Sequence, residues 1–140
     1  MRTHFLSAGI ISFIFTALAF TFTDGDKWLA PQEAKKLRNP LKPISSTISD
    51  GRYLFRQNCK ACHGMLGKGD GPVAVTLKKR CADLSSASVQ QQTDGELYYK
   101  ISIGRVEMPG FKEILESEDR WALVHYIRTL GVTQSSGGGS

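Results

Sequence analysis

Apolar side chains near the C-terminal end of the chain recur with the period of an amphipathic helix. Positions i, i+3, i+4 and i+7 are held by Leu123, Tyr126, Ile127 and Leu130. This spacing places them on one helical face, turned toward a core. The pattern predicts a helix that begins near Ser117, with the acids Glu118 and Asp119 at the positive end of its dipole. Gly131 is expected to end it.

A second helix is predicted from its start signal. The sequence Thr93-Asp94-Gly95-Glu96 fits a capping box, in which Thr93 caps the helix and Glu96 occupies the third helical position. The helix should end at Gly104.

A third helix is predicted from about Asp50 to Asn58, with Ser49 or Asp50 as its cap. Gly51 and Phe55 lie on the same face of this helix. Glycine inside a helix costs about 1 kcal/mol relative to alanine. We therefore expect Gly51 to permit a close crossing with another helix.

The remaining pattern predicts loops and one short helix. Gly64–Gly71 is glycine-rich and should form a loop that ends at Pro72, and a short helix is predicted over Val73–Lys79. No alternating pattern of useful length predicts a strand. The predicted fold class is all-α.

The N-terminal segment has the features of an export signal. A basic start is followed by an apolar run from Phe5 to Phe22, and the small-x-small sequence Ala17-Leu18-Ala19 predicts cleavage after Ala19. The run is at the lower limit for spanning a bilayer, so an uncleaved membrane anchor stays open. In either case residues 1–19 predict an exported protein.

Three further regions are predicted. Residues 20–48, which are polar from Thr23 onward and contain prolines, are predicted to form an extended arm or linker with a short helix over 30–37. This arm is either a simple linker or a segment that lies on a partner. Residues 49–131 form the domain, and 132–140 a flexible Gly/Ser tail typical of an expression linker.

The sequence Cys59-Lys60-Ala61-Cys62-His63 indicates the chemistry of the domain. Two cysteines three residues apart, followed by histidine, form the attachment sequence for c-type haem. On one helical turn the two sulfurs can reach the two vinyl groups of one porphyrin and form thioethers. The adjacent imidazole is then held against one face of the iron. One covalent haem c would also add apolar bulk to a core drawn from about ninety residues.

Two other interpretations of the cysteine pair are weaker. A structural zinc site needs a second pair of ligands, and only Cys81, His4 and His125 remain. A thioredoxin-like pair normally sits in a βαβ unit, which the pattern does not show. Cys81 itself is expected to be a buried, small apolar side chain, with a reactive thiol as the alternative.

With these motifs in place, the chain resembles the class I cytochromes c over about Ser49 to Leu130. The resemblance rests on the pentapeptide, on Gly71-Pro72, on Met108-Pro109-Gly110-Phe111 and on the aromatic-bearing last helix. It implies an all-α domain wrapped around one haem. It also implies that the first and last helices cross closely, with Gly51 and Phe55 against Tyr126.

The axial ligands are expected to be His63 and Met108. A thioether on a loop stiffened by Pro109 can reach the distal face, and the family places such a methionine before the last helix. Met65 is too close to His63 to reach the opposite face. His125 is a weaker candidate and is expected at the surface or boundary.

Other haem contacts follow from the resemblance and from charge. The resemblance implies that the backbone carbonyl of Pro72 holds the second ring nitrogen of His63. The propionates are anions and need donors. The candidates are Lys79, Arg80, Tyr99 and Arg105; a solvated surface position is the alternative for each.

The combined features predict a one-electron carrier rather than an enzyme. It would pass electrons from a quinol-oxidising complex or dehydrogenase toward a terminal oxidase. Its expected partners are redox proteins, foremost membrane respiratory subunits, with no nucleic acid. Trp28-Leu29-Ala30-Pro31, Asn39-Pro40 and Gly69-Asp70-Gly71-Pro72 resemble the mono-haem subunit of alternative complex III, which would associate with the membrane and run its arm over neighbouring subunits.

Alternative functions are a free periplasmic carrier, a haem peroxidase or gas sensor, and a structural subunit. A free periplasmic carrier would transfer electrons in the same way, but without association with the membrane. A peroxidase or sensor would need an open iron position, which Met108 would fill.

Charge is divided unevenly along the chain. Residues 52–80 carry seven basic side chains and one acid, for +6, whereas residues 81–120 carry eight acids and four bases, for −4. Lys60 lies between the two cysteines of the haem-attachment sequence, and Lys68 lies in the loop just after it. We expect the positive half to meet an acidic partner surface, with an ordinary solvated face as the alternative.

Overall fold

The computed structural model describes residues 28–135, and side chains as far as Gly131. Its helices are α1 (Gln32–Lys36), α2 (Ser45–Asn58), α3 (Lys60–His63), the 3-10 turn η1 (Ala74–Thr76), α4 (Ala87–Gln90), α5 (Asp94–Ile103) and α6 (Ser117–Ser135). Within residues 28–135 there is no strand, only an isolated bridge between Arg105 and Met108. The all-α prediction is confirmed.

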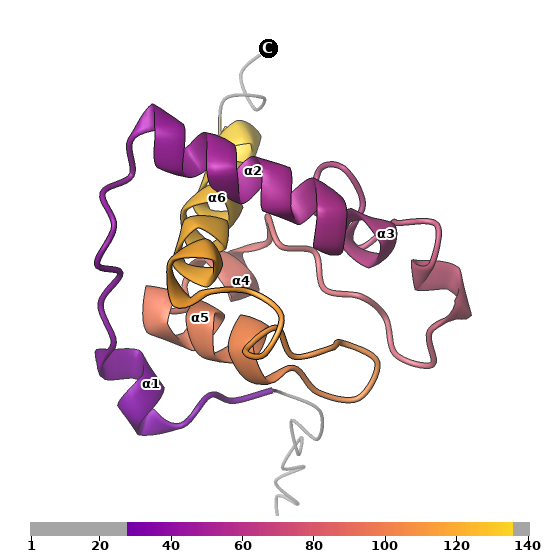
Figure 1. Ribbon diagram of the computed structural model, residues 1–140. Helices are drawn as coiled ribbons and strands as arrows, with labels where there is room; N and C mark the ends of the chain where they lie inside the picture. The colour runs from indigo at the N-terminus through magenta and orange to yellow at the C-terminus, as the bar shows by residue number, and fades with distance from the viewer. Residues whose placement is uncertain (1–27, 136–140) are drawn as a thin grey trace, which may run out of the picture.

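Helices α2 and α6 cross closely, as Figure 1 shows. A side-chain carbon on Gly51 would lie 2.2 Å from the backbone oxygen of Ala122 and 3.0 Å from Cβ of Tyr126. The rings of Phe55 and Tyr126 lie beside the crossing, with centroids 5.1 Å apart. The predicted role of Gly51 is confirmed, because only glycine allows the two backbones this close.

The capping box of α5 is also confirmed. The Thr93 hydroxyl accepts the Glu96 backbone N–H, and the Glu96 carboxylate accepts the Thr93 backbone N–H. Gly104 ends the helix with a φ of +67°. Tyr98 on this helix stacks on Trp121 of α6, with ring centroids 3.9 Å apart, which packs α5 against α6.

Two predicted helix limits are wrong. Helix α2 begins at Ser45 rather than Asp50, without a side-chain cap, and packing of Ile48 against the core supports its extra turn. Helix α6 continues through Gly131 to Ser135. A Cβ on Gly131 would lie 2.6 Å from the Gln90 side chain, so this glycine allows α4 to approach and does not end the helix.

Other local predictions are met in part. The loop 64–71 is irregular, with positive φ at Gly64, Gly67 and Gly69. The helix predicted over Val73–Lys79 is reduced to the single turn η1. Helix α4 was not predicted, because its four residues are too few to establish a helical period.

The described part of the arm, residues 28–44, lies along the domain (Figure 1). The Asn39 side chain donates to the carbonyl of Trp121 at 3.0 Å, and Nε2–H of His125 donates to the carbonyl of Leu41 at 2.9 Å. His125 is buried, contrary to the expectation that it lies at the surface or boundary. The arm contacts it and accepts the hydrogen of its Nε2.

None of the helices within residues 28–135 is long and apolar enough to cross a membrane. The predicted export signal, residues 1–19, and the end of the predicted tail lie outside the described residues.

Candidate functional site

The cysteines and histidine of the pentapeptide are positioned by a tight turn after α2. The Cys59 amide donates to the carbonyl of Phe55 at 2.8 Å, which continues α2 to this point. The amides of Cys62 and His63 then both donate to the Cys59 carbonyl, at 3.2 and 2.9 Å. The resulting turn, α3, ends at Gly64 with a φ of +77°. It brings both thiols and the imidazole to the wall of one hollow.

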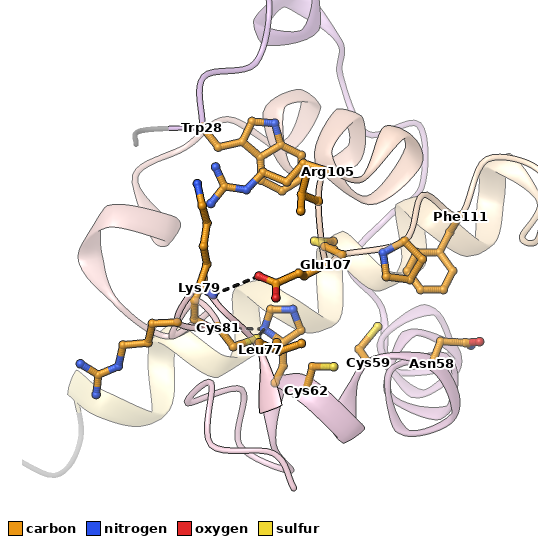
Figure 2. Close-up of a pocket in the computed structure, with 16 residues that line it drawn as sticks. Trp28, Asn58, Cys59, Cys62, Leu77, Lys79, Cys81, Arg105, Glu107 and Phe111 are labelled. Carbon is orange, nitrogen blue, oxygen red and sulfur yellow. Dashed lines mark hydrogen bonds between the residues drawn. The ribbon is translucent and has the colours of Figure 1, made fainter. Parts of the chain in front are cut away.

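Two adjoining hollows meet at this wall. The outer hollow has a volume of about 130 Å³ and the inner about 410 Å³. Six residues line both: Trp28, Cys59, His63, Ala82, Arg105 and Met108. The inner hollow extends to core side chains that include Phe55, Leu97 and Leu123. Figure 2 shows the thiols of Cys59 and Cys62 on one side of the outer hollow, opposite Trp28 and Arg105.

The His63 ring is oriented by the 81–82 segment. Its Nδ1 lies 3.1 Å from the carbonyl oxygen of Ala82 and 3.3 Å from Sγ of Cys81. A carbonyl can only accept, so Nδ1 carries the hydrogen and Nε2 is left with its lone pair. Burial lowers the pKa of His63, although the Ala82 hydrogen bond opposes this shift. The ring is therefore suited to metal ligation.

The partner expected for His63 was wrong. Pro72 is exposed and lines neither hollow, whereas the chain folds back at Cys81 and Ala82 to reach the ring. Gly69 permits this approach, since a Cβ there would lie 2.4 Å from the carbonyl oxygen of Cys81.

The thiols differ in their surroundings. Burial, with a smaller contribution from Cys62, raises the pKa of Cys59 to about 12, so this thiol is protonated and uncharged at neutral pH. Burial also raises the pKa of Cys81. Cys81 is half-buried at the hollow beside His63, so it belongs to the site and is more than a small core side chain.

Met108 lies on a tight turn and, like His63, lines both hollows. The backbones of Arg105 and Met108 exchange two hydrogen bonds, of 2.9 and 2.8 Å. Glu107, within the turn, has a φ of +72°. Its carboxylate accepts the backbone N–H groups of Lys78 and Lys79, at 2.5 and 3.0 Å. These two hydrogen bonds join the methionine turn to the segment that borders the outer hollow.

The candidate propionate donors divide into two groups. Lys79, Arg80 and Arg105 line the outer hollow, and Arg105 also lines the inner one. Tyr99 lines neither hollow. Met65, rejected as a ligand from its spacing, is 53% exposed and also lines neither.

Sequence reasoning missed Trp28, Ala82, Glu107 and Lys100 as wall residues. Trp28 belongs to the short motif Trp28-Leu29-Ala30-Pro31, which the sequence pattern places in the arm. Ala82 acts through its backbone carbonyl, which no side-chain pattern reveals. Glu107 acts on amides 28 and 29 residues away, and Lys100 has no local signal of its own.

The residues present fit a covalently bound haem. Two thiols lie beside a histidine whose Nε2 keeps its lone pair, and a thioether shares the same hollows. The inner hollow has an apolar wall, suited to a porphyrin face, and cationic side chains border the outer hollow. Sulfur and imidazole are ligands that soft and borderline metals favour.

The comparison with known families identifies the chain. The family described as cytochrome c oxidase, cbb3-type, subunit III matches residues 46–127, more than half of the chain. The chain belongs to this cytochrome c family. Its cofactor is covalently bound haem c, and it is an electron-transfer protein.

Curated relatives agree with this family. The cytochrome c subunit of the cytochrome bc1 complex of Corynebacterium diphtheriae is 30% identical over 92 residues, which cover 65% of this chain and 30% of that subunit. Cytochrome c550 of Pseudomonas aeruginosa is 22% identical over 117 residues, covering 79% of this chain and 72% of its own. The chain thus spans about a third of the length of the bc1 subunit it matches.

Solved structures show the same fold. A chain of the reducing HAO-like protein complex of Kuenenia stuttgartiensis aligns with a TM-score of 0.61 and 27% identity, over 67% of this chain and 49% of its own. The c-type cytochrome KustC0563 aligns with a TM-score of 0.51 and 34% identity, over 58% of this chain and 96% of its own.

Proposed function

We propose that this cytochrome carries single electrons in an exported respiratory chain, from a quinol-oxidising complex or dehydrogenase toward a terminal oxidase. Cys59 and Cys62 hold the haem covalently, and His63 and Met108 are the axial ligands of its iron. The observation that carries the proposal is the convergence of Cys59, His63 and Met108 on the walls of both hollows.

Bound haem supplies reversible one-electron exchange at its iron. The chain's own residues would bind the iron and set its reduction potential. Nδ1–H of His63 donates to Ala82 and leaves the lone pair of Nε2 free, so this nitrogen would be the one that binds the iron. Met108, on a turn held by the Glu107 carboxylate, would supply the second protein ligand of the iron. Methionine with histidine raises the reduction potential relative to two nitrogen ligands, which suits an acceptor of electrons from quinol oxidation.

The neutral Cys59 thiol fits covalent attachment. A thiol adds across a vinyl group by forming a carbon–sulfur bond at one vinyl carbon and transferring its hydrogen to the other. No separate oxidant or reductant enters this balance. The thiols of Cys59 and Cys62 would each supply both the sulfur and the hydrogen.

We place the protein on the periplasmic side of the inner membrane, with residues 1–19 as signal or anchor and 49–131 as the cytochrome domain. Similarity to a bc1 complex subunit supports membership in a membrane complex. A free periplasmic carrier is the second candidate, supported by the likeness to cytochrome c550. Resemblance to the mono-haem subunit of alternative complex III stays a prediction.

Two measurements test the function. The haem-loaded protein, produced with export, is mixed with a purified quinol-oxidising complex and then with oxidase-containing membranes, and its haem spectrum is followed. We expect reduction by the first and oxidation by the second. Failure of both exchanges would contradict the respiratory assignment. Rapid binding of carbon monoxide by the reduced protein at neutral pH would favour a sensor or peroxidase, because it requires an open iron position.

A further inference from the structure

The arm is attached to the domain at several separate points. A Cβ on Gly95 of α5 would lie 1.9 Å from the carbonyl oxygen of Ala34, so α1 packs on α5 at backbone distance. Lys35 lies 4.0 Å from Glu96. The Asn39 hydrogen bond to α6 adds a further attachment. These contacts fix the path of the described part of the arm, residues 28–44, and therefore the place of its first described residue, Trp28.

At that place two cations lie close to the Trp28 ring. The guanidinium carbon of Arg105 is 5.0 Å from the centroid of the indole, and Nζ of Lys100 is 5.5 Å from it. Both distances are within the range of cation–π attraction. Burial lowers the pKa of Lys100, and Arg105 adds to this shift while Glu96 opposes it. The indole thus joins the arm to α5 and to the methionine turn.

Trp28 lies at the side of the outer hollow opposite Cys59 and Cys62. Trp28 lines both hollows, and Figure 2 shows it with Arg105 on the side opposite Cys59 and Cys62. In haem the vinyl groups, which thiols attack, occupy one edge, and the propionates occupy the other. The Trp28 side of the hollow is therefore the end at which the anionic groups would lie, beside Arg105 and Lys79.

We propose that Trp28 is a haem-contacting residue supplied by the arm, which closes the pocket at the end opposite the cysteines and holds Arg105 at that end. The inference rests on the proposed attachment of haem at Cys59 and Cys62. If Trp28 contacts the haem, the arm helps to set the reduction potential, although it lies outside residues 46–127, which the family matches.

The sign of the effect follows from charge. Oxidised haem carries one more positive charge than reduced haem, so water entering the pocket favours the oxidised form. Displacement of the Arg105 cation acts in the same direction, because a nearby positive charge favours the reduced form. Burial and neighbouring polar groups are recognised determinants of haem potential. Loss of the indole should therefore lower the potential on both grounds.

The test compares Trp28→Ala, Trp28→Phe and the control Tyr53→Ala in haem-loaded protein. Tyr53 is a 64% exposed aromatic side chain that lines neither hollow. We expect a lower reduction potential in Trp28→Ala, a smaller shift in Trp28→Phe and none in the control. A folded Trp28→Ala protein with the parent's potential would overturn the inference. Haem staining after denaturation is done on each protein, because absence of covalent haem in the parent would instead contradict the proposed function.

A second measurement does not require Trp28 to be replaced. The chain has two tryptophans, Trp28 and Trp121, so Trp121→Phe leaves Trp28 as the single indole emitter. Contact with haem should quench its fluorescence almost completely, and unfolding in guanidinium should restore it. Strong emission from the folded, haem-loaded protein would place Trp28 away from the haem and reject the inference.

Discussion

One carboxylate oxygen of Glu107 accepts the backbone N–H of Lys79 at 3.0 Å. Its second oxygen accepts the neighbouring amide, and the backbone of Glu107 has a φ of +72°. A positive φ is unfavourable for a residue with a side chain. The double hydrogen bond is a compensating interaction that holds this turn, and with it Met108, in place.

Replacing Glu107 with Ala should loosen the ligation by Met108. Both amide hydrogen bonds are lost while the unfavourable φ remains, which should destabilise the turn by about 1 kcal/mol. The sulfur-to-iron charge-transfer band of the ferric protein should disappear at a lower guanidinium concentration than in the parent. Glu113→Ala, an exposed glutamate on the following loop, is the control. Equal midpoints for the parent and Glu107→Ala would show that the turn does not depend on this carboxylate.

Met108→Ala tests the distal ligand directly. We expect loss of the sulfur-to-iron band, a lower reduction potential and new carbon monoxide binding. The control is Met65→Ala, which removes an exposed thioether away from the hollows. An unchanged band in Met108→Ala would refute the assignment.

Gly51→Val tests the crossing of α2 and α6. The new side chain would overlap the backbone of Ala122, and overpacking of this kind costs about 1–3 kcal/mol. Denaturant unfolding of the haem-loaded protein measures the loss. Gln57→Val places the same β-branched residue at an exposed position of α2 and should cost much less. Valine forms helix more readily than glycine, so a loss in Gly51→Val cannot come from helix propensity, and undiminished stability of this variant would contradict the close crossing.

The basic half of the chain predicts salt-sensitive docking. Lys60 is exposed beside the two cysteines, so Lys60→Glu should slow electron transfer to the acceptor at low ionic strength and reduce its salt dependence. Lys112→Glu, an exposed lysine in the acidic half, should have a smaller effect. Rates that do not depend on salt would indicate an apolar docking surface or a permanent complex.

Lys68 does not offer the same test. Its ammonium donates to Ser85 at 2.6 Å and lies 3.8 Å from Asp83, and the Ser85 hydroxyl, with Lys68, lowers the pKa of that carboxyl. Lys68→Glu would place two carboxylates together and disturb the loop. A slower electron-transfer rate in Lys68→Glu could therefore come either from weaker docking or from the disturbed loop.

Several features could be predicted from the sequence because they depend on neighbours along the chain. The spacing of Cys59, Cys62 and His63 fits one helical turn, and the structure forms that turn. The capping box at Thr93 needs only residues three apart. The close crossing at Gly51 could be predicted because the apolar face of its helix had to pack against another one.

Tertiary structure decided the contacts between residues distant in sequence. Ala82 reaches His63 across 19 positions through a backbone carbonyl, an atom that every residue possesses and no sequence pattern marks. The burial of His125 and the location of Trp28 depend on where the arm folds back. Gly131 allows α6 to pack against Gln90 instead of ending the helix. Local spacing fixes which turns can form, whereas chain reversal and packing determine which side chains those turns meet.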